Sequence, residues 1–391
     1  MDNSQNFNIK AKFFIKTSLF LGVTGLLLSV FGYLVNDKHF FHSYLVAYVF
    51  WTSIMLGALF FTMLNHIAGA TWNIVFRRIL ESLMGTVPLM AILFIPVIFG
   101  LHDLYHWSHE EVITSDILLQ KKVPYLNAPF FIIRAILYFG IWFVLFKILQ
   151  KISLAQDVEF QPVQLKKMRT VSAPGIVLFA ITITFAAFDW LMSLDAHWYS
   201  TIFGVYIFAG SFLALLAVLV TIGLTLRKKG ILDDVITVEH YHDLGKFLFG
   251  FTIFWGYMAF SQYFLIWYGN IPEETIWYRH RWDGTWKYIT LILVFGHFLI
   301  PFISLMPRAA KRNLKFMKVI SIWILVMHFF DIYWIVMPTM YEHGFYLSWI
   351  DFTTFIGIAG IFLAYFWSRY FKRSLLPIND PFLKKSMEFK N

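Results

Sequence analysis

The stretch FDWLMSLDAHWYS, residues 188–200, places two carboxylates and a histidine inside an otherwise apolar part of the chain. Between residues 171 and 226 the only acids are Asp189 and Asp195, and neither Lys nor Arg occurs. A charge near the centre of a bilayer costs about 2.5–3.5 kcal/mol on insertion scales, so an ionisable residue in an apolar helix is a functional candidate. We therefore expect Asp189 to bind a proton or a ligand, or to pair with Arg134 of the preceding apolar segment.

The remainder of that stretch favours a polar hairpin at a membrane surface. Asp195 suits the N-cap of the next helix, and His197 and Trp198 suit the interface, where such side chains anchor a protein. If the helix continued through residue 197, Asp189, Ser193 and His197 would share one face, since they are four residues apart.

Polar residues recur in the later apolar segments. His297 lies near the middle of its segment, and His328 and Asp331 share a helical face because they are three residues apart. The sequence HFFDIYW repeats the Phe-Asp pair of AAFDWLM, which suggests a parallel duplication of a four-helix unit. Together with groups nearer the other side of the membrane, these residues are expected to form a proton path. Its candidates are Asp189, Arg134, His297, His328, Asp331, Glu81 and His66.

A second set of polar residues gathers near one end of the apolar segments. A quinone binds where an aromatic-lined slot meets groups that accept protons near the membrane surface. Two alternatives stay open: an ordinary interfacial belt of His and aromatic residues, or a haem b ligated by His297 and His328. The quinone-binding candidates are His42, His102, Asp103, His106, Arg134 and Asp189, with His39 and Tyr105 beside them.

Ten apolar segments position these residues. Of the 391 residues, 59% are hydrophobic and only 14% are charged, as is typical of an integral membrane protein. Each segment has the ~20 residues that a helix needs to cross a bilayer, and lipid favours helices for segments of this length. We predict an all-α integral membrane protein with ten transmembrane helices at 13–35, 41–65, 79–101, 128–152, 171–194, 198–226, 246–268, 286–306, 316–338 and 350–371.

The predicted helices form one polytopic domain, 1–391, that contains two bundles. Helices 2–5 form the first four-helix bundle, 41–194, and helices 6–9 form the second, 198–338, with helices 1 and 10 peripheral. Lys and Arg concentrate in the loops on the side of both termini, so the positive-inside rule places the N-terminus and the tail, 372–391, in the cytoplasm. The net charge of +9 therefore reports topology, and nucleic-acid binding is not expected.

The connections and the absence of Cys add two expectations. The outer connection, 102–127, is expected to fold over the membrane face as a cap, and the connection 153–170 to be a basic cytoplasmic loop. Without Cys the chain offers no thiolate for an iron–sulfur cluster and no attachment point for haem c. Any such redox centre belongs to a partner subunit, and no catalytic residue or metal site is predicted in this chain.

Three blocks of the sequence carry a resemblance to a known family. The blocks are FDWLMSLDAHWYSTIFGVYIFAG at 188–210, FSQYFLIWYGNIPEETIWY at 260–278, and HFLIPF followed by KRNLKFM within 297–317. They resemble the membrane subunits of bacterial alternative complex III, a quinol:cytochrome c oxidoreductase related to the NrfD and polysulfide reductase membrane subunits. The resemblance extends over nearly the whole chain and is closest to the shorter, ActF type of subunit.

The resemblance implies a place in the bacterial inner membrane, within a complex that oxidises menaquinol. Its partners would be a paralogous NrfD-like subunit, an iron–sulfur subunit, c-type cytochrome subunits that carry the haem c, and a terminal oxidase, with lipid around them. The ActC-type paralogue is the better candidate for the quinol site, whereas an ActF-type subunit would serve assembly, proton movement or conformational coupling. The alternative from another class is a secondary transporter, which would favour helices broken by Gly or Pro around a midplane site.

Overall fold

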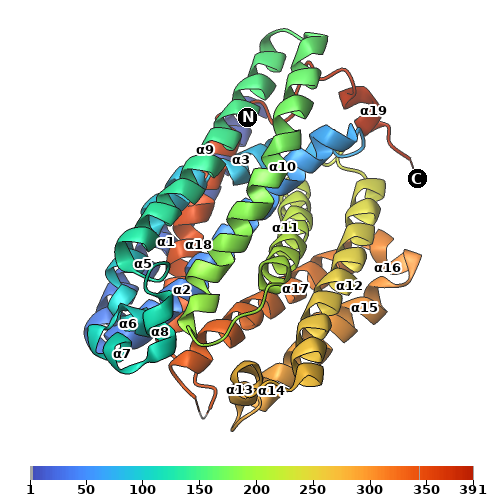
Figure 1. Ribbon diagram of the computed structural model, residues 1–391. Helices are drawn as coiled ribbons and strands as arrows, with labels where there is room; N and C mark the ends of the chain where they lie inside the picture. The colour runs from blue at the N-terminus through green and yellow to red at the C-terminus, as the bar shows by residue number, and fades with distance from the viewer. Residues whose placement is uncertain (1–2, 343, 391) are drawn as a thin grey trace.

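The structure, a computed structural model, describes residues 3–342 and 344–390, so Asn391 of the predicted tail lies outside it. Long helices run side by side through the molecule, and both ends of the chain lie toward the same end of the bundle (Figure 1). No strand occurs in the described residues. The prediction of an all-α protein is therefore confirmed.

Most of the predicted segments form single long helices, and two are interrupted. The third predicted span is divided into the short helices α3 (Arg77–Met84), α4 (Val87–Leu93), α5 (Ile95–Phe99) and α6 (Leu101–Leu104). The eighth is α14 (Trp286–Ile292), a π-helical turn η4 (Leu293–Leu299) and α15 (Ile300–Leu305). The long helices are α1 (Asn3–Val35), α2 (Asp37–Ala68), α9 (Ala128–Val158), α10 (Pro162–Trp190), α11 (Phe203–Lys228), α12 (Val238–Gly269), α17 (Leu314–Val336) and α18 (Trp349–Phe371).

Nine helical stretches within the described residues are long and apolar enough to cross a membrane. The seventh predicted span, 246–268, lies in α12, which has sufficient length but is not one of the nine. Residues such as Trp255, Gln262 and Tyr263 make α12 less apolar than its neighbours. The chain thus has the helices of a multi-pass membrane protein, and the count of ten remains a prediction.

Helix α2 is the centre of the packing. It contacts α3, α10, α11, α17 and α18, and its buried residues occupy every face of the helix. Because α2 has no lipid-facing side over most of its length, it is apolar all round rather than amphipathic. Helix α1 packs along α18 through glycines: a Cβ on Gly25 would lie 2.5 Å from the backbone nitrogen of Gly357. Small residues of this kind let membrane helices approach closely.

The other contacts between helices fall largely within the two groups of helices that the sequence suggested, predicted helices 2–5 and 6–9. Helix α9 packs against α10 and α4, whereas α12 packs against α11, α15 and η4. Helices α2 and α10 also contact α11, so the two sets adjoin each other along their length. The division into two bundles remains an interpretation of these contacts.

Three expectations about local structure are wrong. Helix α10 ends at Trp190 and α11 begins at Phe203 with Ile202 at its N-cap, so Asp195 is not the N-cap of α11, and His197 does not share a helical face with Asp189. A 3-10 turn at Met192–Leu194 redirects the chain after α10. The expected loop 153–170 is reduced to a short turn, because α9 continues to Val158 and α10 starts at Pro162, a favourable first helical residue.

The outer connection does fold as a cap. It forms α6, a 3-10 turn at His106–Ser108, α7 (Glu110–Ser115) and α8 (Ile117–Lys122), with Trp107 buried beneath them. The C-terminal tail, with α19 (Leu383–Met387), lies on the opposite end of the bundle and contacts the turn η1 (Ile74–Phe76). There Ser386 Oγ donates a hydrogen bond of 2.7 Å to the carbonyl of Trp72.

Candidate functional site

Asp331 is a buried carboxylate whose hydrogen-bond partners in the described residues are all neutral. Its two oxygens accept hydrogen bonds from the Tyr206 hydroxyl of α11 and from Trp255 Nε1 of α12, the latter at 3.1 Å. The residue is 3% exposed, and no Lys or Arg forms an ion pair with it in the described part of the chain. Asp331 lies five residues before the end of α17, which places it ~7–8 Å below that helix end.

Two imidazoles lie beside this carboxylate. His328 is one helical turn from Asp331 on α17, and a Cβ on Gly210 would lie 3.3 Å from the His328 ring and 3.7 Å from Asp331 Oδ2. His328 Nε2 and Ser53 Oγ of α2 form a hydrogen bond of 2.9 Å, whereas His328 Nδ1 has no partner in the described residues. The two side chains therefore border the same small region next to α11.

His297 reaches the site through Trp255. The two rings stack with their centroids 4.1 Å apart and their planes at 24°. Both ring nitrogens of His297 are buried without a hydrogen-bond partner in the described residues. An imidazole normally satisfies at least one nitrogen when it is buried, so this one is available for a proton or a ligand. Trp255 thus connects His297 to Asp331, because its ring contacts one and its N–H the other.

The backbone at His297 is a π-helical turn with two physical causes. Pro301 follows four residues later and has no N–H to donate to the His297 carbonyl, which interrupts the α-helical ladder. Trp323 Nε1 of α17 also donates a 2.7 Å hydrogen bond to the carbonyl of Gly296 and so inserts a side chain into the same turn. Single π turns inside helices are frequent at functional sites.

Asp189, unlike Asp331, forms an ion pair with a buried cation. Arg134 donates from Nε to Asp189 Oδ2 at 2.8 Å and from a terminal nitrogen to Oδ1 at 3.0 Å. The hydroxyls of Tyr125 and Tyr138 donate to the same carboxylate at 2.9 and 2.7 Å. The expected pairing of Asp189 with Arg134 is confirmed. A carboxylate with a bidentate cation and two further donors has every lone pair engaged, so this pair holds α9 to α10.

The predicted proton-path residues therefore separate into distinct groups. His297, His328 and Asp331 lie together, while Asp189 and Arg134 lie in the other bundle, and no hydrogen bond between described residues joins the two groups. Glu81 lies at the far end of the bundle, bound to Arg78 and to the Ser153 hydroxyl. His66 lies in the last turn of α2, at the same end of the bundle as Glu81, and lines a cavity there. One continuous path through all seven residues is not present.

The predicted quinone-binding residues do not converge either. His42 is buried in α2, where its Nδ1 bonds the carbonyl of Lys38 at 2.8 Å. His102 is exposed and stacks on His109, and Asp103 and His106 also lie in the outer cap, where they are partly or fully exposed. Arg134 and Asp189 are engaged in their ion pair beneath Tyr125.

The polar hairpin at 195–200 is part of the same outer cap. His197 bonds the carboxylate of Asp116 at 2.5 Å, and this hydrogen bond holds the pKa of Asp116 below its usual range. Trp198 is not an interfacial anchor: it is buried and stacks on Trp277 with ring centroids 4.3 Å apart. The hairpin therefore fastens two outer connections to each other rather than facing lipid.

The residues around His297 and His328 do not fit a haem b. Trp255 lies flat against one imidazole, and Ser53 occupies Nε2 of the other. The Phe50 ring lies 5.3 Å from the His328 ring, and Gly210 closes the remaining side. A macrocycle between these two imidazoles would have to displace Trp255 and Phe50. In the described part of the chain, no three His, Asp or Glu side chains gather as a metal site.

Sequence reasoning missed several functional partners. Tyr206, Trp255 and Ser53 carry no charge, and in a chain with 20% aromatic residues no pattern distinguished them. Another buried carboxylate, Asp351 of α18, was also missed. It lies 3.3 Å from His39 and accepts a hydrogen bond from Ser43 at 2.5 Å. Its capping box with Ser348, a Ser three residues before an acid, was a readable signal.

Comparison with known proteins identifies no family. No protein-family model matches the chain, and no curated protein is significantly similar to it. The resemblance to alternative complex III therefore remains a prediction from the three sequence blocks. The site has to be interpreted from its own geometry.

Proposed function

We propose that this chain is a membrane subunit of a menaquinol-oxidising complex of the bacterial inner membrane, similar to alternative complex III. In this proposal the haem c and iron–sulfur carriers belong to partner subunits, with cytochrome c or a terminal oxidase as electron acceptor. The chain itself contributes a proton-transfer site formed by Asp331, His328 and His297. The absence of Cys and the three sequence blocks support a subunit without its own electron carrier.

One observation carries the proposal: Asp331 is a buried carboxylate without a cation, next to imidazoles with unpartnered nitrogens. Burial of an isolated charge is costly, so such a carboxyl group persists in membrane helices chiefly where it exchanges protons or binds ions. An ion site would present several oxygen ligands, whereas the neighbours of Asp331 are the hydrogen-bond donors Tyr206 and Trp255. These neighbours suit a group that alternates between its charged and neutral forms.

The contrast with Asp189 supports the assignment. Both carboxylates follow a Phe near the end of a helix, but Arg134 permanently balances only one of them. An acid held by a bidentate guanidinium stays ionised and gives no proton to a neighbour. Asp331 has His297 on the preceding helical segment where Asp189 has Arg134, and imidazole is the side chain that exchanges protons near neutral pH. The second bundle therefore has the site suited to proton exchange.

Isolation from native membranes tests the assignment to a complex. The chain, carrying an affinity tag at its native locus, is expected to co-purify with subunits that contain haem c and iron–sulfur clusters, detected by optical and paramagnetic resonance spectra. Quinol oxidation by the isolate should be sensitive to loss of the chain. Isolation of the chain with no haem- or cluster-bearing partner would overturn the proposal and would favour a protein that acts alone, such as a transporter.

A further inference from the structure

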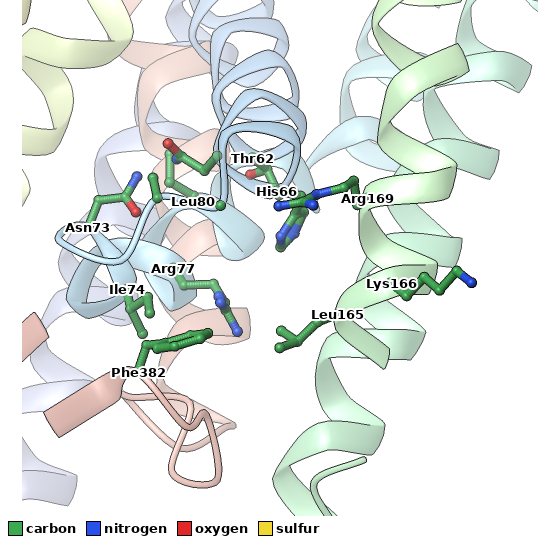
Figure 2. A pocket seen from close by; sticks show the side chains of 13 residues that line it. Thr62, His66, Asn73, Ile74, Arg77, Leu80, Leu165, Lys166, Arg169 and Phe382 are labelled. Atoms are coloured by element: carbon green, nitrogen blue, oxygen red, sulfur yellow. The ribbon is translucent and has the colours of Figure 1, made fainter. Parts of the chain in front are cut away.

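A cavity of about 390 Å³ opens at the end of the bundle that carries both termini. It lies between the last turn of α2, the connection to α3 and the first part of α10, and Phe382 of the C-terminal tail closes one side (Figure 2). A volume of this size lies within the range of ~300–1,000 Å³ that is usual for small-molecule sites.

The cavity is lined by cations. Figure 2 shows Arg77, Arg169 and His66 around it, whereas Lys166 lies at its rim on α10 with the side chain directed outward. Arg77 is balanced by Asp380 of the tail, at 2.7 Å. Lys166 and Arg169 form no ion pair within the described residues, and no acid lines the cavity there. Arg169 of α10 therefore faces a cavity without a matching negative charge, and Lys166 adds a second cation at its rim.

An unpartnered amide supplies an independent sign of a ligand. Asn73 lines the cavity and is 3% exposed, and its Nδ2 has no hydrogen-bond partner in the described residues. A buried N–H group without an acceptor is destabilising, so such groups usually bind a water or a ligand oxygen. Amide and guanidinium donors together call for an anionic ligand with several oxygens.

The backbone lets Arg169 approach the cavity. Gly69 ends α2 in the left-handed region at φ 61°, and a Cβ there would lie 3.0 Å from a terminal nitrogen of Arg169. Glycine is favoured at this position both for its conformation and for the space that it leaves. The turn after α2 thus fits the arginine against the cavity wall.

We propose that this cavity binds the phosphate group of an anionic phospholipid. It lies where the apolar helices end, on the side rich in Lys and Arg that faces the anionic leaflet. An apolar groove between α9 and α10, lined by Ile148, Ile152, Val163 and Val171, adjoins it and shares Lys166 with it. That groove suits an acyl chain whose headgroup enters the cavity, which is why a lipid fits better than free phosphate.

Thermal stability of the full chain in nonionic detergent tests the proposal, with phosphatidylglycerol, phosphatidylcholine or inorganic phosphate as the added probe. Phosphatidylglycerol is expected to raise the melting temperature in a saturable way, because a ligand that binds only the folded state stabilises it. The other two probes are expected to have little effect. Native mass spectrometry should show one phosphatidylglycerol molecule retained.

Variants locate the site. Lys166→Gln and Arg169→Gln are each expected to weaken binding roughly 5-fold, and together ~25-fold, because each basic residue near an anionic lipid surface contributes about 1 kcal/mol. Lys228→Gln removes the same charge from the last turn of α11, where Lys228 is exposed and lines neither the cavity nor the groove, and should change binding little. Asn73→Asp adds a negative charge inside the cavity and should abolish binding.

Two outcomes would overturn the proposal. Equal losses for Lys166→Gln, Arg169→Gln and Lys228→Gln would mean that the lipid responds only to net charge. Stabilisation by inorganic phosphate that matches that by phosphatidylglycerol, and disappears in the Arg169→Gln variant, would mean that the ligand is a soluble phosphate. Lys166 and Arg169 are both exposed, so their variants are expected to fold and the comparison does not depend on Asn73→Asp.

Discussion

Replacing Asp331 by Asn is the most direct test of the proposed proton-transfer site. The amide keeps the shape of the carboxyl group but cannot take up or release a proton near neutral pH. General acid–base groups contribute about 10²–10⁴-fold to the steps that they serve. We therefore expect Asp331→Asn to slow proton-coupled quinol oxidation ~100-fold or more in the purified complex.

The cost to stability follows from the two hydrogen bonds of Asp331. Tyr206 donates to one carboxylate oxygen and Trp255 to the other, whereas Asn has a single acceptor oxygen. One of the two donors is then left buried without a partner, at a cost of about 1–3 kcal/mol. Tyr206→Phe is the matched control, because it removes one of these hydrogen bonds and keeps the carboxyl group. It should lower stability by a comparable amount and leave most of the turnover.

The assay combines both readouts on the same preparations. Complex reconstituted in liposomes is supplied with a menaquinol analogue, and acceptor reduction and internal pH are followed together. Thermal denaturation of the detergent-solubilised complex gives the relative stability. If Asp331→Asn assembles and shows an unchanged rate and an unchanged number of protons per quinol, Asp331 has no part in proton transfer and the interpretation of the site is wrong.

Three further predictions concern the groups around this site and elsewhere. His297→Phe should keep the stack on Trp255 and remove two buried nitrogens that have no partners among the described residues. The melting temperature should therefore stay equal or rise, while proton-coupled turnover falls. A drop in both would contradict the role of His297. Asp189→Asn leaves the Arg134 guanidinium buried without its anion and should lower the stability of the fold by about 3–5 kcal/mol. Adding Arg134→Gln to the same chain should recover part of this loss. The fraction of folded protein in detergent measures both effects. Arg312 holds the pKa of Glu239 below its usual range, so their ion pair stabilises the start of α12 at a pH above the usual carboxyl pKa. This stability is lost as the pH falls through the lowered pKa of Glu239. Hydrogen exchange at the start of α12 should therefore quicken at low pH, and Glu239→Gln should remove that pH dependence.

The sequence predicted well where one strong physical effect dominates. Lipid requires long apolar helices, so the approximate positions of most helices followed from composition. The pairing of Asp189 with Arg134 followed because a buried acid and a buried base at similar depths on consecutive helices stabilise each other. These inferences needed only the length of a segment and the cost of burying a charge.

Prediction failed where several weak effects compete. The N-cap assigned to Asp195 was wrong because a 3-10 turn after α10 moved the start of α11 to Phe203, and such turns are set by the surrounding packing. The π turn at His297 depends on Trp323 from another helix, which no local pattern at residue 297 could reveal. The docking of the tail depends on Asp380 meeting Arg77, which lies far away in the sequence.

The two Phe-Asp pairs differ in how their carboxylates are balanced, and this difference favours Asp331 over Asp189 as the proton-exchanging group. From sequence, Asp189 was the stronger candidate because it lies deep in an apolar segment that has neither Lys nor Arg, and Asp331 was its echo. Arg134, Tyr125 and Tyr138 saturate Asp189, so its carboxylate has no site left for a proton or a quinol oxygen. A buried charge that is fully paired is best explained by assembly, whereas one that lacks a cation needs another explanation. We therefore assign the proposed proton-transfer site to the Phe-Asp pair of α17, where Asp331 has His328 and His297 as neighbours and no permanent cation.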